Sequence, residues 1–260
     1  MQPTINIALR ATREAAAALT RYSERPDRIR ILDENAGRAI TNAHRDAEQA
    51  MLYQLQKVFP DHCYRSTISD PIKGADESTT WLINPLDGIN NLQHGLAAWT
   101  TAIACKTQGN IQHAIIYVPV LEEEFIASRG IGASLNNHRI RVSGAVELEN
   151  SLLAFDSRTV IDEFETFQQL AEAARSNRAQ LRISGCHTLD LAYVAAGRFD
   201  AGFHSWSDPV ALSASQLLLQ EAGGLLSDSL GNPQPAAESG LAFGNPRCFK
   251  QLLKYLRPAS

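Results

Sequence analysis

One short segment, residues 84–88 (Asn-Pro-Leu-Asp-Gly), combines a carboxylate, an amide and two turn-forming residues. Residues 80–83 (Thr-Trp-Leu-Ile) precede it and read as a buried strand, and the proline and the Asp-Gly pair predict a turn at the end of that strand. Side chains of such a turn lie at a strand end. Asp87 can there either serve a ligand or brace the turn itself.

The elements before and after this turn predict an α+β first half. Apolar residues at helical spacing predict a helix over residues 1–19 and a second over 43–59, which Pro60 ends. Residues 98–105, 111–118 and 124–128 read as strands joined by short turns, which is typical of an antiparallel meander.

The remainder of the chain alternates strands with helices and predicts an α/β second half. We expect strands at 152–155, 180–183, around Phe203 and at 225–227, and helices at 161–176, 189–196, 209–222 and 247–256. The sequence shows no evident linker, and we expect the boundary between the two halves near residues 140–150. This gives two predicted halves, residues 1–145 and 146–260.

Composition excludes several classes of function. The chain is 44% apolar, so it can bury a large core, and its net charge of −4 with a pI of about 6.0 argues against direct nucleic-acid binding. No window is apolar enough for a signal peptide or a membrane span. The cysteines form no C-x-x-C pair, which favours reduced thiols in a cytoplasmic protein.

Residues 81–91 (Trp-Leu-Ile-Asn-Pro-Leu-Asp-Gly-Ile-Asn-Asn) resemble the W-[IV]-I-D-P-[IL]-D-G-T-x-N signature of the inositol monophosphatase family. Segments 189–198, 221–224 and 244–246 match that family in order and spacing, and segments 1–10 and 42–48 point to its bacterial SuhB branch. The resemblance implies an αβαβα layered fold, a homodimer, and two or three Mg²⁺ ions between the halves that activate water for phosphate cleavage.

The resemblance also implies that most of the metal-binding and catalytic positions are replaced. Asp87 and the backbone carbonyl of Leu86 remain as metal ligands, and Gly88, Ile89 and Asn90 are the phosphate-turn equivalents. Neutral or basic residues stand at the other family positions: His44, Thr67 with Ile68, Asn84, Ile89 in place of the water-activating threonine, and Ala211 in Val210-Ala211. Since Mg²⁺ requires hard anionic oxygens, the resemblance predicts weak or absent metal binding.

Several of these residues have two interpretations. His44 and His204, the latter at a substrate-contacting position of the family, could form a new acid-base or metal site with Asp87, or be tolerated replacements in an idle cleft. Asp208 could replace the lost aspartate, but Asp208-Pro209 favours a helix N-cap. We expect His94, His113 and His138 to be surface residues, and residues 122–124 (Glu-Glu-Glu) to be a solvated charge run.

Three functions follow from the resemblance. The leading hypothesis is a pseudophosphatase that binds a protein partner, because the SuhB branch supports transcription antitermination through an elongation factor, NusA. The alternative is an enzyme repurposed for a small molecule through His44, Asn84, Asp87 and His204. The third is a weak inositol-1-phosphate or sugar-phosphate phosphatase.

Overall fold

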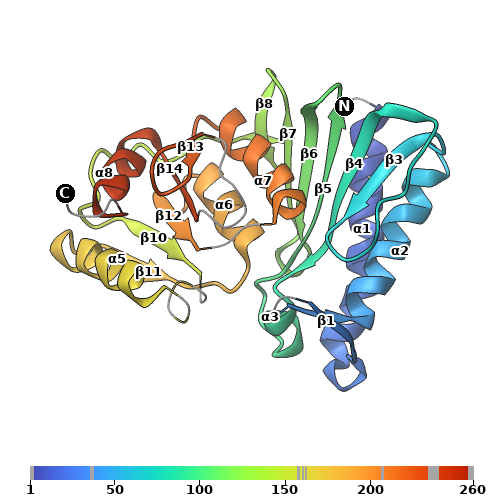
Figure 1. The fold of residues 1–260 in the computed structure, drawn as a ribbon, viewed down its shortest axis with the longest axis horizontal. Coiled ribbons are helices and arrows are strands. Elements are labelled where there is room, and N and C mark those ends of the chain that lie inside the picture. Colours follow the sequence, from blue (N-terminus) through green and yellow to red (C-terminus); the bar gives the residue numbers. More distant parts are fainter. Residues whose placement is uncertain are drawn as a thin grey trace.

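The structure, a computed structural model, describes residues 3–35, 38–156, 159, 161, 163–205, 208–233 and 240–256. Its layers follow the order helices, sheet, helices, sheet, helices (Figure 1). This is the αβαβα arrangement predicted from the sequence. No helix within those ranges is both long and apolar enough to cross a membrane.

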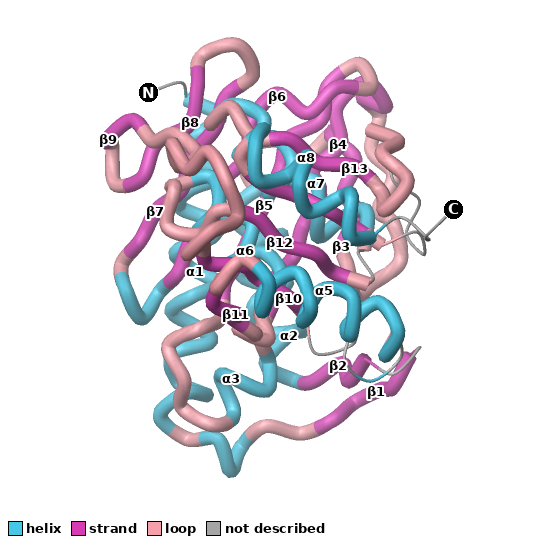
Figure 2. The backbone as a smooth tube through the Cα atoms, turned by 90° about the vertical axis from the view of Figure 1, so that its left-hand side faces the viewer, coloured by secondary structure: helices cyan, strands magenta, loops and turns pink. Residues whose placement is uncertain are grey.

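The first layer contains α1 (Pro3–Glu24) and α2 (Asn42–Gln56), the two helices predicted at the start of the chain. Between them lie the 3₁₀ helix η1 (Pro26–Arg28) and a hairpin of β1 (Ile31–Asn35) and β2 (Arg38–Thr41). Figure 2 shows this hairpin at the same end of the molecule as the short helix α3 (Ile89–Gln93).

The second layer is a seven-stranded sheet, ordered β3-β4-β5-β6-β7-β8-β9. Strands β5 to β7 confirm the predicted antiparallel meander, which β4, β8 and β9 extend, and β3 adds to it in parallel. The 3₁₀ helix η2 (Pro119–Leu121) joins β6 to β7. The strand bounds are β3 (His62–Ser66), β4 (Asp76–Asp87), β5 (Thr100–Thr107), β6 (Asn110–Val118), β7 (Glu123–Ser128), β8 (Gly132–Leu135) and β9 (His138–Arg139).

Strand β4 is longer than predicted and absorbs most of the expected turn. It continues through the Asn-Pro-Leu-Asp segment, with an irregular register against β5 between Asn84 and Asp87. The chain turns only at Gly88, which has a φ of 89° and precedes α3. A side chain at Gly88 would also meet the Ala98 carbonyl oxygen at 2.6 Å, so glycine is required there.

The other two layers come from the second part of the chain. Its five-stranded sheet has the order β11-β10-β12-β14-β13, with β11, β10 and β12 parallel and β14 antiparallel to both of its neighbours. The bounds are β10 (Leu152–Phe155), α5 (Phe164–Ser176), β11 (Gln180–Arg182), α6 (His187–Ala195), β12 (Ala201–His204), α7 (Pro209–Glu221), β13 (Leu225–Ser227), β14 (Leu241–Gly244) and α8 (Pro246–Leu256).

Three hydrophobic clusters hold the layers together. One lies between the seven-stranded sheet and α1 and α2, and includes Trp81 and Ile103. Another lies between the two sheets, where α6 and α7 pack, and includes Phe125 and Phe243. The third lies under α5 and α8. Because α6 and α7 bury side chains against both sheets, the predicted boundary near residue 145 crosses a shared core and stays a prediction.

The acidic run at residues 122–124 corrects an expectation. Glu123 and Glu124 are not solvated charges, since their side chains are only 13% and 16% exposed and each pairs with an arginine. Glu123 binds both terminal guanidinium nitrogens of Arg198, which follows α6, and Glu124 binds Arg13 of α1. Strand β7 is thereby tied to a helical layer on each side.

We predict that Gly202→Ala in β12 lowers the free energy of unfolding by about 1–3 kcal/mol through overpacking. The added methyl group would lie 2.5 Å from a ring carbon of Phe243 and 2.6 Å from the carbonyl oxygen of Ala154, and that oxygen belongs to a fixed neighbouring strand. Urea unfolding measures the change. Gly144→Ala is the matched control, because its methyl group meets nothing within 4 Å. Equal effects of the two substitutions would contradict the prediction.

Candidate functional site

The carboxylate of Asp87 joins the first sheet to α6, the helix that packs between the two sheets. Asp87 ends β4, and its Oδ2 accepts a 2.7 Å hydrogen bond from the backbone N–H of Thr188 in the first turn of α6. The Cys186 thiol donates to the Asp87 carbonyl oxygen at 3.6 Å. A carboxylate at a helix N-terminus satisfies a free N–H group and opposes the positive end of the helix dipole. Asp87 therefore braces the start of α6 rather than its own turn.

Neutral side chains surround Asp87 on the β4 side. Asn84 is 3% exposed, and its side-chain nitrogen donates to Thr188 Oγ1 at 3.4 Å while its oxygen accepts from Thr67 at 3.4 Å. Both distances are at the long end of the hydrogen-bond range. Ile89 packs its side chain against the apolar cluster under α1 and α2. The amide of Asn84 and the hydroxyl groups of Thr67 and Thr188 therefore form hydrogen bonds with one another.

Helix α3 adds a second link to the segment that precedes α6. The side-chain nitrogen of Asn91 donates to the carbonyl oxygens of Ala98 and Ser184 at 2.6 and 2.7 Å. Ser184 lies between β11 and α6. Gly88, Ile89 and Asn90 thus lie at the start of a helix that is held against this segment.

Helix α2 contributes His44 and a carboxylate that the sequence analysis missed. His44 is buried, and its Nδ1 accepts from the Thr41 backbone N–H at 3.2 Å and lies 2.9 Å from Thr41 Oγ1, which completes a capping box. One helical turn later, Glu48 is 5% exposed and accepts a 2.7 Å hydrogen bond from Ser69. The i, i+4 spacing of His44 and Glu48 on one helix face was the available signal.

His204 lies in a separate cluster at the second sheet. It is fully buried at the end of β12, its Nε2 is 3.1 Å from Asp190 Oδ2, and its ring stacks on His187 with centroids 4.2 Å apart. Burial raises the pKa of the Asp190 carboxyl, against the opposing effect of the His204 hydrogen bond and charge. Among the described residues, Asp190 Oδ1 and His204 Nδ1 have no hydrogen-bond partner.

Asp156 extends this cluster to the end of β10. Its Oδ2 accepts the Ser205 N–H at 3.0 Å and lies 3.5 Å from His187 Nε2, and its Oδ1 accepts from the Thr159 hydroxyl and N–H. Burial acts to raise the pKa of Asp156, but the charges of His204 and His187 and the hydrogen bonds from Thr159 outweigh it and hold the pKa below its usual value. The carboxyl ends of parallel strands, where Asp156 and His204 lie, commonly form ligand sites in α/β sheets.

The structure does not bring the predicted site residues into one cluster; they form hydrogen bonds with different partners. Asp87 and Asn84 meet at Thr188, whereas His44 is engaged at the start of α2 and His204 at Asp190. Ala211 follows Asp208 in the first turn of α7. Asp208 accepts the N–H groups of Val210 and Ala211 at 2.7 and 3.2 Å, which confirms the predicted N-cap.

Two of the three histidines that were predicted to lie on the surface are exposed. His94 and His138 lie on the surface as expected. His113 is instead half-buried, with Nδ1 2.9 Å from Ser128 Oγ, because β6 is an interior strand of the sheet. The surface prediction for His113 was therefore wrong.

The donors near Asp87 fit Mg²⁺ poorly. In the described part of the chain, no three His, Cys, Asp or Glu side chains are grouped closely enough to hold a metal ion. Asp87, the Leu86 carbonyl and the amide of Asn84 would supply a single negative charge, and Asp87 already holds the N–H of Thr188. Mg²⁺ gives up its water reluctantly and favours carboxylate oxygens, so this set offers it little.

Comparisons with known proteins agree with this fold. The sequence matches the inositol monophosphatase family over residues 1–259. It is 40% identical to the Nus factor SuhB of Pseudomonas aeruginosa, over 99% of this chain and 97% of that protein, and 33% identical to the Nus factor SuhB of Escherichia coli K12 with the same coverage.

A solved structure gives the same result in three dimensions. The extragenic suppressor protein suhB from Bartonella henselae superimposes with a TM-score of 0.94 over the whole of both chains, at 28% sequence identity. Sequence and fold agree along the full length, and the chain belongs to the inositol monophosphatase family.

Proposed function

We propose that this protein is a SuhB-like pseudophosphatase, which acts by binding a protein partner rather than by hydrolysing phosphate esters. The observation that carries the proposal is the contact between Asp87 and Thr188. The one carboxylate retained at the family's metal positions is used to join β4 to α6. Its neighbours Asn84 and Thr67 are neutral and bind each other.

The partner is suggested by the relatives. The similar proteins of P. aeruginosa and E. coli are both named Nus factors, and this chain covers 97% of each. We infer that the partner is a transcription elongation factor, that the protein acts in the cytoplasm, and that it forms a homodimer. A net charge of −4 supports contact with a protein rather than with nucleic acid.

A second candidate function rests on the cluster at the ends of β10 and β12. His187 is 31% exposed and lies beside Asp156, so it is the group of that cluster that a solvent-borne molecule could reach. An imidazole beside a carboxylate can serve as a general acid or base. A repurposed enzyme would therefore use His187 with Asp156, rather than His44, Asn84, Asp87 and His204 together.

We expect inositol 1-phosphate hydrolysis by the purified protein to stay at background in millimolar Mg²⁺, with an unchanged melting temperature. A ligand stabilises the folded state only as far as its concentration exceeds its dissociation constant. A phosphate-release assay and thermal unfolding with and without Mg²⁺ measure both. Asp87→Ala is the matched variant. A melting temperature that Mg²⁺ raises in the wild type but not in this variant would refute the pseudophosphatase.

Restoring the acidic cluster should restore metal binding, and only as a set. The quadruple variant Thr67→Glu, Asn84→Asp, Ile89→Thr and Ala211→Asp adds three carboxylates at positions that the resemblance assigns to the metal site of the family. A metal ion held by them can compete with the N–H of Thr188 for the Asp87 oxygen. The metal-free variant should be less stable than the wild type because like charges repel. Calorimetry with Mg²⁺ should show binding by the folded quadruple variant and none by Asn84→Asp. Binding by Asn84→Asp alone would show a nearly intact metal site.

Partner binding should not depend on metal. We expect calorimetry to detect a complex with the elongation factor of the source organism, with an affinity that EDTA or Mg²⁺ changes by less than about twofold. The quadruple variant should bind the partner equally well in EDTA, because its substitutions are confined to the positions that the resemblance assigns to the metal site. The absence of a complex at micromolar concentrations, or a complex that requires Mg²⁺, would count against the proposed role.

A further inference from the structure

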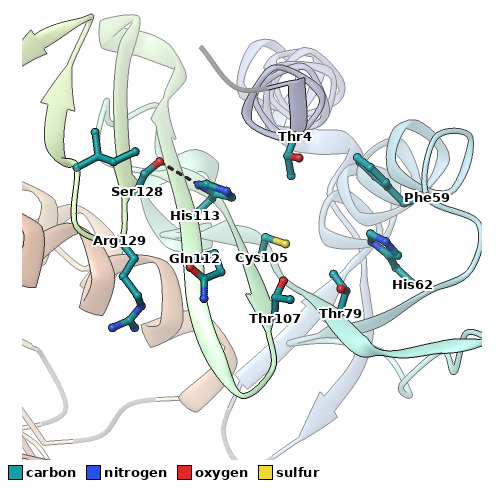
Figure 3. Close-up of a pocket in the computed structure, with 11 residues that line it drawn as sticks. Thr4, Phe59, His62, Thr79, Cys105, Thr107, Gln112, His113, Ser128 and Arg129 are labelled. Carbon is teal, nitrogen blue, oxygen red and sulfur yellow. Dashed lines mark hydrogen bonds between the residues drawn. The ribbon is translucent and has the colours of Figure 1, made fainter.

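A cavity of about 360 Å³ lies at the far end of the seven-stranded sheet, where α1 begins (Figure 3). Thr4 of α1 forms one wall, Phe59 and His62 form a second, and residues of β4 to β7 form the floor. This volume suits a small ligand. The lining of the cavity includes neither Asp87 nor His204, and none of their hydrogen-bond partners.

The floor of the cavity is polar although it continues a hydrophobic surface. In the middle of the sheet, Trp81 and Ile103 pack under α1 and α2. Towards the start of α1 the same face presents hydroxyl, thiol and imidazole groups in cross-strand pairs: Thr79 opposite Thr107, Cys105 opposite His113, and His113 opposite Ser128. A polar strip within an otherwise apolar layer requires a reason other than packing.

The charged side chains that line the cavity are all basic. Its lining includes no aspartate or glutamate, but it includes two histidines and an arginine. The first turn of the 22-residue helix α1 has no acidic residue either, so the positive end of its dipole is directed here without a compensating carboxylate. Arg129 lies at the rim, where its Nε donates to the Ile111 carbonyl oxygen and its guanidinium points away from His113 (Figure 3).

His113 contacts a hydroxyl group and no carboxylate in the described part of the chain. Its Nδ1 contacts Ser128 at 2.9 Å, and burial without a nearby carboxylate lowers the pKa of its imidazole. His62, in contrast, accepts from Trp81 Nε1 at 3.0 Å and has Asp76 3.8 Å from its Nε2. The neighbouring Cys105 is neutral, because burial raises the pKa of its thiol to about 11.

We propose that this cavity binds a small oxyanion, a carboxylate or a phosphoryl group, through the imidazole of His113 and the hydroxyl groups beside it. Hydroxyl groups, a protonated imidazole and a helix N-terminus are all donors to an anionic oxygen. The site is remote from Asp87 and does not depend on the proposed function. The two oxyanion classes share this chemistry and differ in shape and charge.

Binding at this site takes up a proton. An anion beside His113 favours the imidazolium form and opposes the effect of burial, so the pKa of His113 is higher in the complex than in the free protein. Affinity therefore rises as the pH falls below the ordinary histidine value of about 6.5. The other titratable groups facing His113 are Cys105, which stays neutral, and His62, whose charge would act in the same direction.

The test is a nuclear magnetic resonance titration of the histidine side chains of the full chain with three probes: sulfate, acetate and glycerol. Sulfate and acetate keep their charge between about pH 6 and pH 8. We expect saturable shifts of the His113 ring with at least one of the two anions, several-fold tighter at the lower pH. His113→Gln, which can still contact Ser128, should weaken binding about tenfold by calorimetry. His138→Gln, on the surface, should not.

Each outcome decides the matter. Binding of sulfate alone assigns a phosphoryl ligand, and binding of acetate alone assigns a carboxylate. Shifts with glycerol but with neither anion would replace the oxyanion by a neutral polyol and overturn the proposal. So would an absence of saturable shifts at millimolar anion, or an affinity that His113→Gln leaves unchanged.

Discussion

The hydrogen bond between the Asp87 carboxylate and the N–H of Thr188 is the contact on which the centre of the molecule depends. It connects the end of β4, in one sheet, to the start of α6, the helix that packs between the two sheets. Without this acceptor, the first turn of α6 would leave a backbone donor without a partner close to a buried interface. Further hydrogen bonds cross the same boundary, and they involve Asn84, Cys186 and Asn91.

A junction made in this way differs in physical character from one made by metal ions. Clusters of carboxylates repel one another, so they persist in a fold only when a cation compensates them. Asn84 and Thr67 are neutral and hydrogen-bond to each other, and Ile89 adds apolar surface to the core. A junction of neutral groups carries no such repulsion.

Much of the fold was accessible from the sequence because it depends on local periodicity. The meander of β4 to β7, the boundaries of β10 and the cap of α7 at Asp208 all follow from residue type and spacing. Strands β1, β2, β3, β8, β9 and β14 were not predicted, because such short segments carry too little periodicity of their own and become strands only by pairing with neighbours. Glu123 was taken for a solvated charge because its partner Arg198 is distant in the sequence.

The candidate site was predictable in part for the same reason. The segment from Asn84 to Gly88 carries its own signature, but the contact of Asp87 with Thr188 is a tertiary one between residues about a hundred positions apart. His204 was placed with Asp87 by resemblance, whereas its partner is Asp190 on α6. Spacing along a chain identifies which groups end a strand or start a helix. Which of these groups meet is decided by how the layers pack.

The cluster of Asp156, His187, Asp190 and His204 shows why packing matters for chemistry as well. Two buried carboxylates lie there beside two stacked imidazoles. The pKa values of the two carboxyls move in opposite directions, because Asp156 accepts hydrogen bonds from Thr159 and Ser205 whereas Asp190 is more deeply desolvated. The second sheet thus keeps buried charge at the strand ends, where α/β sheets place their ligands.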